Sequence, residues 1–331
     1  MTFDQMLPVI FMAIMGLAML TYVILDGYDL GVGLLMPRAT AAQKDMMVAS
    51  IGPFWDANET WLVLGVGILL IAFPKAHGMV LTALYLPVAV MLIGLILRGV
   101  AFDFRVKAHD SHKPLWNRLF VVGSGLAAAS QGWMLGHYIT GLLPGWQYQV
   151  FAAAIALALP AAYVLLGACW LILKTEDALQ RRAVHWARRT WPAAVIGMGL
   201  ISIITPWVSP TVRERWFSMP AFIALLPIPL TTVTALLALR AVLNSNRVLG
   251  KLCWLPFALV VAVFMLGFFG LAYSLYPFVV MDRLTIWQAA SSPEALKVIL
   301  IGVAISVPAI AAYTVLAYRV FGGKASALTY A

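Results

Sequence analysis

The sequence predicts an all-α membrane protein with nine transmembrane helices, arranged as two four-helix bundles plus one peripheral helix. Three observations support this prediction. Hydrophobic residues make up 63% of the 331 residues and charged residues only 11%. Soluble domains are about 45–50% apolar and about 25% charged, and disordered chains are more polar still. The apolar residues are gathered into long runs, and the basic residues lie mostly between alternate runs.

Each apolar run is long enough to cross a lipid bilayer. A spanning helix needs roughly 20 apolar residues, because the hydrocarbon core is about 30 Å thick and a helix rises about 1.5 Å per residue. None of the runs shows the period-two alternation of a membrane β-strand. The first run is longer than one crossing requires and is expected to tilt or project. The predicted spans are 7–36, 53–74, 78–101, 117–141, 150–173, 191–208, 220–240, 252–279 and 297–321.

The chain is predicted to form a single membrane domain, residues 1–331, without a detachable soluble part. Segment 174–190 contains two acids and four arginines, and it is predicted to be a polar helix on the cytoplasmic surface that links two halves. No basic region precedes the first run, which is therefore expected to be a retained helix and not a cleaved signal peptide. The predicted parts are the halves 1–141 and 150–279 and the ninth helix 297–321.

The positions of lysine and arginine predict the orientation of the chain. With nine spans, 17 of the 22 basic residues fall on one side of the membrane and 5 on the other. Cytoplasmic loops carry an excess of lysine and arginine, so the N-terminus is predicted to be periplasmic and the C-terminus cytoplasmic. The same rule accounts for the net charge of +9. The basic character therefore gives no indication of nucleic-acid binding.

Ionisable residues within the apolar runs mark a candidate functional site. A charge at membrane depth costs about 2.5–3.5 kcal/mol on insertion scales, so such residues usually have a function. Two pairs of acids occur in the first two spans, and each pair has the i, i+3 spacing that places both side chains on one helix face. An arginine and a further acid lie at the end of the third span. These residues are Asp26 and Asp29, Asp56 and Glu59, and Arg98 and Asp103.

Two interpretations of these residues are open from the sequence. Helices joined by short loops are usually adjacent, and buried carboxylates near an arginine could accept protons from the cytoplasm and pass them inward. In the structural interpretation, Asp29 is hydrated at the interface, and Asp56 and Glu59 complement a helix dipole. Arg98 and Asp103 then form only an interfacial pair.

Cofactor and metal ligands are sparse. His137, near the outer end of the fourth span, is the histidine best placed to meet a haem, although a single histidine in a bundle is more often structural. No HExxH, CxxCH or GxxxxGK[ST] motif occurs, and no metal site is predicted. The residues alone indicate a membrane bundle with a proton-handling site. An ion-coupled secondary transporter is the alternative, and a scaffold whose acids only fix helices is a third interpretation.

Several motifs resemble subunit II of the cytochrome bd-type ubiquinol oxidases. The two most specific are Asp-Gly-Tyr-Asp-Leu-Gly-Val-Gly at 26–33 and Gly-Pro-Phe-Trp-Asp-Ala-Asn-Glu-Thr-Trp at 52–61. The segments 98–105, 276–279 and 284–292 also fit, and the resemblance extends from the first helix to the last. The form of the second motif and the short chain resemble the cyanide-insensitive branch.

The resemblance implies a subunit of an electrogenic quinol:oxygen oxidoreductase in the bacterial inner membrane, which oxidises ubiquinol and reduces oxygen to water. It also implies nine helices that bind no haem and that stabilise subunit I. Subunit I would carry haems b and d, or haem b only. Small single-helix accessory subunits, a structurally bound ubiquinone and lipid are further partners implied by the family.

The resemblance also assigns roles to residues. It places Asp26 and Asp56 on a proton route from the cytoplasm toward the oxygen-reducing haem. Some relatives lack an acid at the position of Glu59, so this chain has an additional carboxyl group beside the motif. We therefore predict a route through Asp26, Asp29, Asp56 and Glu59, supported by Trp55, Asn58, Trp61, Arg98 and Asp103.

Overall fold

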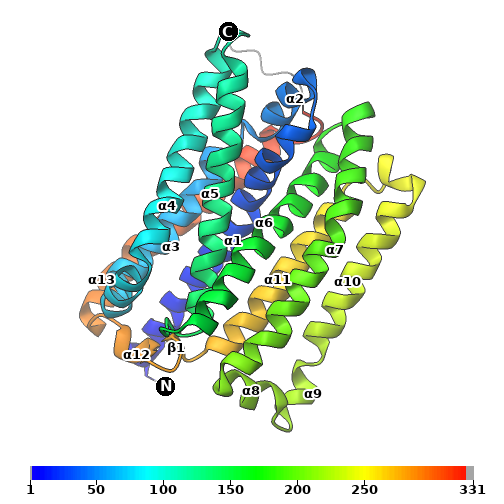
Figure 1. Cartoon of the computed structure of the whole chain (residues 1–331). Coiled ribbons are helices and arrows are strands. Elements are labelled where there is room, and N and C mark those ends of the chain that lie inside the picture. Colours follow the sequence, from blue (N-terminus) through cyan, green and yellow to red (C-terminus); the bar gives the residue numbers. More distant parts are fainter. Residues whose placement is uncertain (1, 326–331) are drawn as a thin grey trace.

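The structure, a computed structural model, describes residues 2–325 and consists mainly of long helices that run side by side (Figure 1). Among these residues, nine helices are long and apolar enough to cross a membrane. The predicted all-α polytopic fold is therefore confirmed. Helix α1 (Phe3–Leu35) begins at one end of the bundle and α13 (Pro293–Val320) ends at the other, as an odd number of crossings requires.

The long helices are α1 (Phe3–Leu35), α3 (Trp55–Ala72), α4 (Pro74–Lys107), α5 (Lys113–Ile139), α6 (Trp146–Lys174), α7 (Asp177–Val208), α10 (Pro227–Asn244), α11 (Leu255–Leu275) and α13 (Pro293–Val320). The shorter elements are η1 (Met36–Arg38), α2 (Ala41–Ile51), α8 (Pro210–Phe217), α9 (Ala221–Leu225), η2 (Asn246–Leu249), β1 (Phe278–Val280), β2 (Leu284–Thr285) and α12 (Ile286–Ala289). The two strands pair in an antiparallel manner.

The helices pack mainly with their neighbours in sequence. Helices α1, α3, α4 and α5 lie together, and α6, α7, α10 and α11 form a second group. Extensive contacts of α6 with α1 and α5 join the groups, while α13 packs against α3 and α1 at one edge. In Figure 1, α10 lies at the opposite edge from α13.

Helices α1 and α6 approach each other so closely that only glycine fits at their crossing. A Cβ atom on Gly31 would lie 1.8 Å from the carbonyl oxygen of Tyr163, and one on Gly167 would lie 2.5 Å from the backbone nitrogen of Val32. Small residues allow membrane helices to pack backbone against backbone. This crossing explains Gly27 and Gly31 of the first motif, whereas Gly33 lies against Ser124 and Phe120 of α5.

We predict that Gly31→Ala destabilises the protein, although alanine favours helix formation. Overpacking of a filled interior typically costs about 1–3 kcal/mol. The matched control is Gly67→Ala in α3, where an added Cβ meets no atom within 4 Å. Alanine there is expected to be neutral or to stabilise by up to about 1 kcal/mol. Thermal unfolding of the purified variants measures the difference, and equal midpoints would contradict the close crossing.

The separate surface helix predicted at 174–190 does not form. Lys174 ends α6, Thr175 and Glu176 connect the two helices, and the remaining residues belong to α7, which continues without interruption to Val208. No proline or glycine occurs between Asp177 and Trp191 to end the helix. At 32 residues, α7 is about 48 Å long, and a bilayer core of about 30 Å leaves its polar first part outside the core.

Other boundaries also differ from the prediction. The eighth span was predicted to end at residue 279, but α11 ends at Leu275, because Pro277 cannot continue a helix. The chain then forms β1, β2 and α12. The seventh span divides into α9 and α10, with Pro227 in the first turn of α10. Helix α2 was not predicted at all, because its eleven residues show no long apolar run.

Candidate functional site

Three helices bring an arginine and two of the predicted acids into one buried cluster. The Arg98 guanidinium, from α4, donates through Nη1 to Asp26 Oδ1 of α1 and through Nη2 to Glu59 Oε1 of α3. The side chains of Arg98 and Asp26 are 2% and 1% exposed, while that of Glu59 is 28% exposed. Arg98 therefore bridges two acids at the centre of the first helix group.

Asp29 adds a third carboxyl group to this region. It is completely buried, and its Oδ2 accepts a hydrogen bond of 2.8 Å from Asn58 Nδ2. Among the described residues, Asp29 Oδ1, Asp26 Oδ2 and Arg98 Nε have no hydrogen-bond partner. If all three carboxyl groups were ionised, only one cation would balance them. Protonation of one carboxylate would therefore reduce the excess of buried negative charge. An excess of buried carboxyl groups over cations is the arrangement that a proton-binding site requires.

Asn58 holds Asp29 in place and connects it to two tyrosines. Its Nδ2 also donates to the Tyr28 hydroxyl at 2.9 Å, and its Oδ1 accepts from the Tyr318 hydroxyl at 3.0 Å. The two tyrosine hydroxyls hydrogen-bond to each other. One amide therefore joins α1, α3 and α13 around a buried carboxyl group.

Replacing Asn58 with leucine is expected to lower the free energy of unfolding by about 1–3 kcal/mol, because buried partners lose their hydrogen bonds. The loss is expected as a lower thermal midpoint of the purified protein. Asn244→Leu, at an exposed position near the end of α10, is the control and should have little effect. An unchanged midpoint for the Asn58 variant would show that Asp29 does not depend on this amide.

A second hydrogen-bonded chain ends beside Asp26. The Tyr163 hydroxyl donates to Gln131 Oε1 at 2.7 Å, and Gln131 Nε2 donates to the Tyr22 hydroxyl at 2.8 Å. Tyr22 precedes Asp26 by one helical turn and lies beside its carboxyl group. The sequence prediction missed these residues. The available signal was Gln131, a polar residue in the middle of an apolar run.

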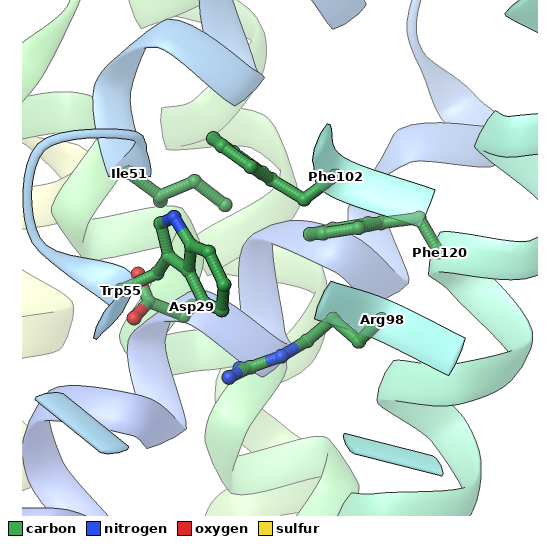
Figure 2. A pocket seen from close by; sticks show the side chains of 6 residues that line it. All are labelled: Asp29, Ile51, Trp55, Arg98, Phe102 and Phe120. Carbon is green, nitrogen blue, oxygen red and sulfur yellow. The ribbon is translucent and has the colours of Figure 1, made fainter. Parts of the chain in front are cut away.

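A narrow pocket lies beside the cluster, lined by Asp29, Ile51, Trp55, Arg98, Phe102 and Phe120. Figure 2 shows the Trp55 indole, the Asp29 carboxylate and the Arg98 guanidinium turned toward the same space. The space is too narrow to admit a water molecule. The Trp55 ring packs on Phe102, with ring centroids 5.3 Å apart. Water can therefore reach Asp29 through this pocket only if side chains such as Trp55 move.

The remaining predicted residues lie outside the buried cluster. Asp56 and Asp103 are exposed on the surface of the chain, and neither forms an ion pair with another described residue. The alternative Arg98–Asp103 pair is therefore wrong, because Arg98 turns toward Asp26. The interfacial interpretation of Asp29 is also wrong, since the residue is buried. Trp61 is buried and donates through Nε1 to Thr314 Oγ1 at 3.1 Å, which fixes α3 to α13.

The residues of the cluster do not fit a haem or a metal ion. Their pocket cannot hold a water molecule, and Arg98 pairs with Asp26 and Glu59. His137 lies apart in α5, where its ring packs beside Trp133 with centroids 5.4 Å apart. In the part of the chain that the structure describes, no group of three or more His, Cys, Asp or Glu is arranged to hold a metal ion.

Comparison with known proteins identifies the family to which this chain belongs. The family model described as cytochrome bd terminal oxidase subunit II matches residues 7–321, which is nearly the whole chain. The chain belongs to this family. The resemblance inferred from the two motifs at 26–33 and 52–61 is therefore confirmed, and the buried cluster is a feature of a bd oxidase subunit II.

Individual relatives agree with this assignment. Subunit 2 of the cytochrome bd ubiquinol oxidase of Bacillus subtilis is 38% identical over 103 residues, which cover 30% of each chain. Subunit 2 of the cytochrome bd-I ubiquinol oxidase of Escherichia coli is 27% identical over 141 residues, which cover 42% of this chain and 37% of the relative. These matches thus span only about a third of either relative. A probable cytochrome oxidase subunit 2 of Haemophilus influenzae is 24% identical, with 91% of this chain and 90% of the relative covered.

The fold is also shared with a solved structure. The bd oxidase from Geobacillus thermodenitrificans contains a chain that superposes with a TM-score of 0.77, although only 18% of the aligned residues are identical. The match covers 96% of this chain and 99% of that one. The arrangement of the long helices in residues 2–325 is therefore shared with a chain of that oxidase.

Proposed function

We propose that this chain is the non-haem subunit II of a quinol oxidase that oxidises ubiquinol and reduces oxygen to water in a bacterial inner membrane. The chain would have a periplasmic N-terminus and a cytoplasmic C-terminus. The observation that carries the proposal is the buried cluster of Asp26, Arg98, Glu59 and Asp29 in a chain of the subunit II family. Haems b and d, or haem b alone, would lie in the partner subunit I. The structural ubiquinone and the accessory subunits remain expectations from the family.

The cluster is proposed to supply protons for the reduction of oxygen. Exposure decreases in steps from Asp56, which is exposed, through the half-buried Glu59, to the buried Asp26 and Asp29. Such a series leads from the surface of this chain to its interior. Protons taken from the cytoplasm, together with quinol protons released outside, would create a membrane potential without a pump.

The exposed face of α3 and α4 is proposed to contact and stabilise subunit I. Asp103 lies exposed near the end of α4, and both helices carry exposed apolar side chains. A carboxylate that faced lipid would be costly, whereas a protein partner can supply polar groups for it. The apolar side chains on this face include Val63, Leu70, Leu92, Ile96 and Val100.

The assignment is tested by purification through a tag on this chain, followed by a reduced-minus-oxidised visible spectrum and measurement of oxygen uptake on ubiquinol. Haem bands together with oxygen uptake are expected. A pure 36.0 kDa protein without haem, from membranes that contain active oxidase, would contradict the proposal and favour a transporter.

A further inference from the structure

A cleft lies between α7 and the segment that follows α10. It is found at the end of the bundle where most basic residues lie, away from the acid cluster. It is open to solvent and admits water over about 180 Å³. Its walls are formed by Arg181 and Arg188 of α7 and by Ser245, Asn246, Val248 and Leu249. No acidic residue lines it. The cleft therefore combines two guanidinium groups with a hydroxyl and an amide, which is a donor set for an anion.

The two arginines are held differently. Arg188 donates through Nε at 2.8 Å and also through Nη2 to the carbonyl oxygen of Leu243, near the end of α10. This contact fixes the guanidinium at the wall of the cleft. Arg181 is exposed and forms no side-chain hydrogen bond or ion pair with the described residues. It is available to a ligand.

The Arg188 end of the cleft lies near the boundary between water and lipid, three residues before Trp191, and Arg181 lies about 10 Å farther out along α7. Trp191 follows the polar first part of α7, and Arg240 of α10 lies over its ring, 5.3 Å from the centroid. Tryptophan is enriched at this depth in membrane proteins. Beyond it, both helices expose apolar side chains, namely Ile196, Leu200 and Ile203 on α7 and Leu230, Val233 and Leu237 on α10.

We propose that this cleft binds the phosphate group of an anionic phospholipid. Arg181 and Arg188 would hold the phosphate, Ser245 and Asn246 would add hydrogen bonds, and the acyl chains would lie along α7 and α10. Guanidinium groups match phosphate oxygens well, and basic pockets between membrane helices are suited to anionic headgroups. The adjoining apolar faces favour a lipid over free phosphate. The lipid would connect α7 to α10 at the edge of the second helix group.

The test is native mass spectrometry of the purified complex, titrated with phosphatidylglycerol, phosphatidylcholine or inorganic phosphate. Phosphatidylglycerol is expected to bind most tightly. Arg181→Gln should weaken it about fivefold and Arg181→Gln with Arg188→Gln about 25-fold, since each arginine near a lipid surface contributes about that much. The matched control replaces Arg38 and Arg118, two exposed arginines outside the cleft, with glutamine and should leave the affinity unchanged.

The charge reversal Arg181→Glu separates a loss of binding from a loss of folding, because it leaves the contact of Arg188 with Leu243 in place. It is expected to abolish the preference for phosphatidylglycerol over phosphatidylcholine. Unchanged binding by this variant, or an equal loss in the Arg38 and Arg118 control, would overturn the proposal. Displacement of phosphatidylglycerol by an equal concentration of inorganic phosphate would also overturn it and would identify a site for the free ion.

Discussion

Replacing Arg98 with methionine is expected to prevent stable assembly of the protein. The substitution preserves much of the side-chain volume but leaves Asp26 and Glu59 without their cation. Breaking a buried ion pair by removing one partner costs about 3–5 kcal/mol, which is a large part of the stability of a typical protein. The amount of protein in membranes and its thermal midpoint in detergent should both fall sharply.

A second variant distinguishes the contribution of the Arg98 charge from that of its planar guanidinium group. Arg98→Lys keeps the positive charge but cannot bridge both acids with a planar fork, so its stability is expected to lie between wild type and methionine. Arg118→Met, at an exposed position in α5, is the control and should resemble wild type. Normal accumulation of the Arg98→Met protein would show that the three-helix cluster does not hold the bundle together.

Replacing Asp26 with asparagine is expected to preserve the assembled complex but to lower oxygen uptake about 100-fold, because a positioned acid contributes about 10²–10⁴-fold to proton transfer. The asparagine oxygen can still accept from Arg98, and Glu59 still pairs with the same guanidinium. An amide cannot accept and release the proton. Turnover on ubiquinol and the haem content of the complex are the two measurements.

Asp110→Asn is the matched control, because Asp110 is exposed near Lys113 outside the cluster. Its turnover should equal that of wild type. Undiminished turnover of the Asp26→Asn complex would favour the interpretation in which the acids only fix helices. Failure of assembly would contradict the expectation that the amide keeps the contact with Arg98, and would show that the charge of Asp26 is needed for stability.

Asp56→Asn tests the contribution of the surface acid independently of the buried acids. Asp56 makes no ion pair within the described residues, so its neutralisation should leave the thermal midpoint unchanged. If protons enter at this position, oxygen uptake should nevertheless decrease. Full activity of a complex with normal haem content would remove Asp56 from the route.

The nine spans were predictable because each depends on the composition of one continuous run. The presence of buried acids was predictable for the same reason, since a charge within such a run is costly. Which acids meet was not predictable. Asp56 and Glu59 differ by only about 60° around α3, and the packing of α3 on α1 decides which one turns inward.

Contacts between segments that are far apart in the sequence could not be predicted either. Tyr22 and Gln131 meet across 109 positions, and Asn58 reaches Tyr318 across 260. No local pattern specifies such pairs. The same applies to α2 and to the β1–β2 hairpin, because short elements leave little periodicity to detect.

Proton transfer through the buried acids to the site of oxygen reduction is the main proposal for this chain. It is tested most directly by reconstituting the complex in vesicles and measuring, with a pH-sensitive dye, proton uptake that follows a pulse of oxygen. Asp26→Asn is expected to slow this uptake strongly, while quinol-reduced haem is still present at normal levels. Uptake at the wild-type rate in the assembled Asp26→Asn complex would show that Asp26 does not carry these protons.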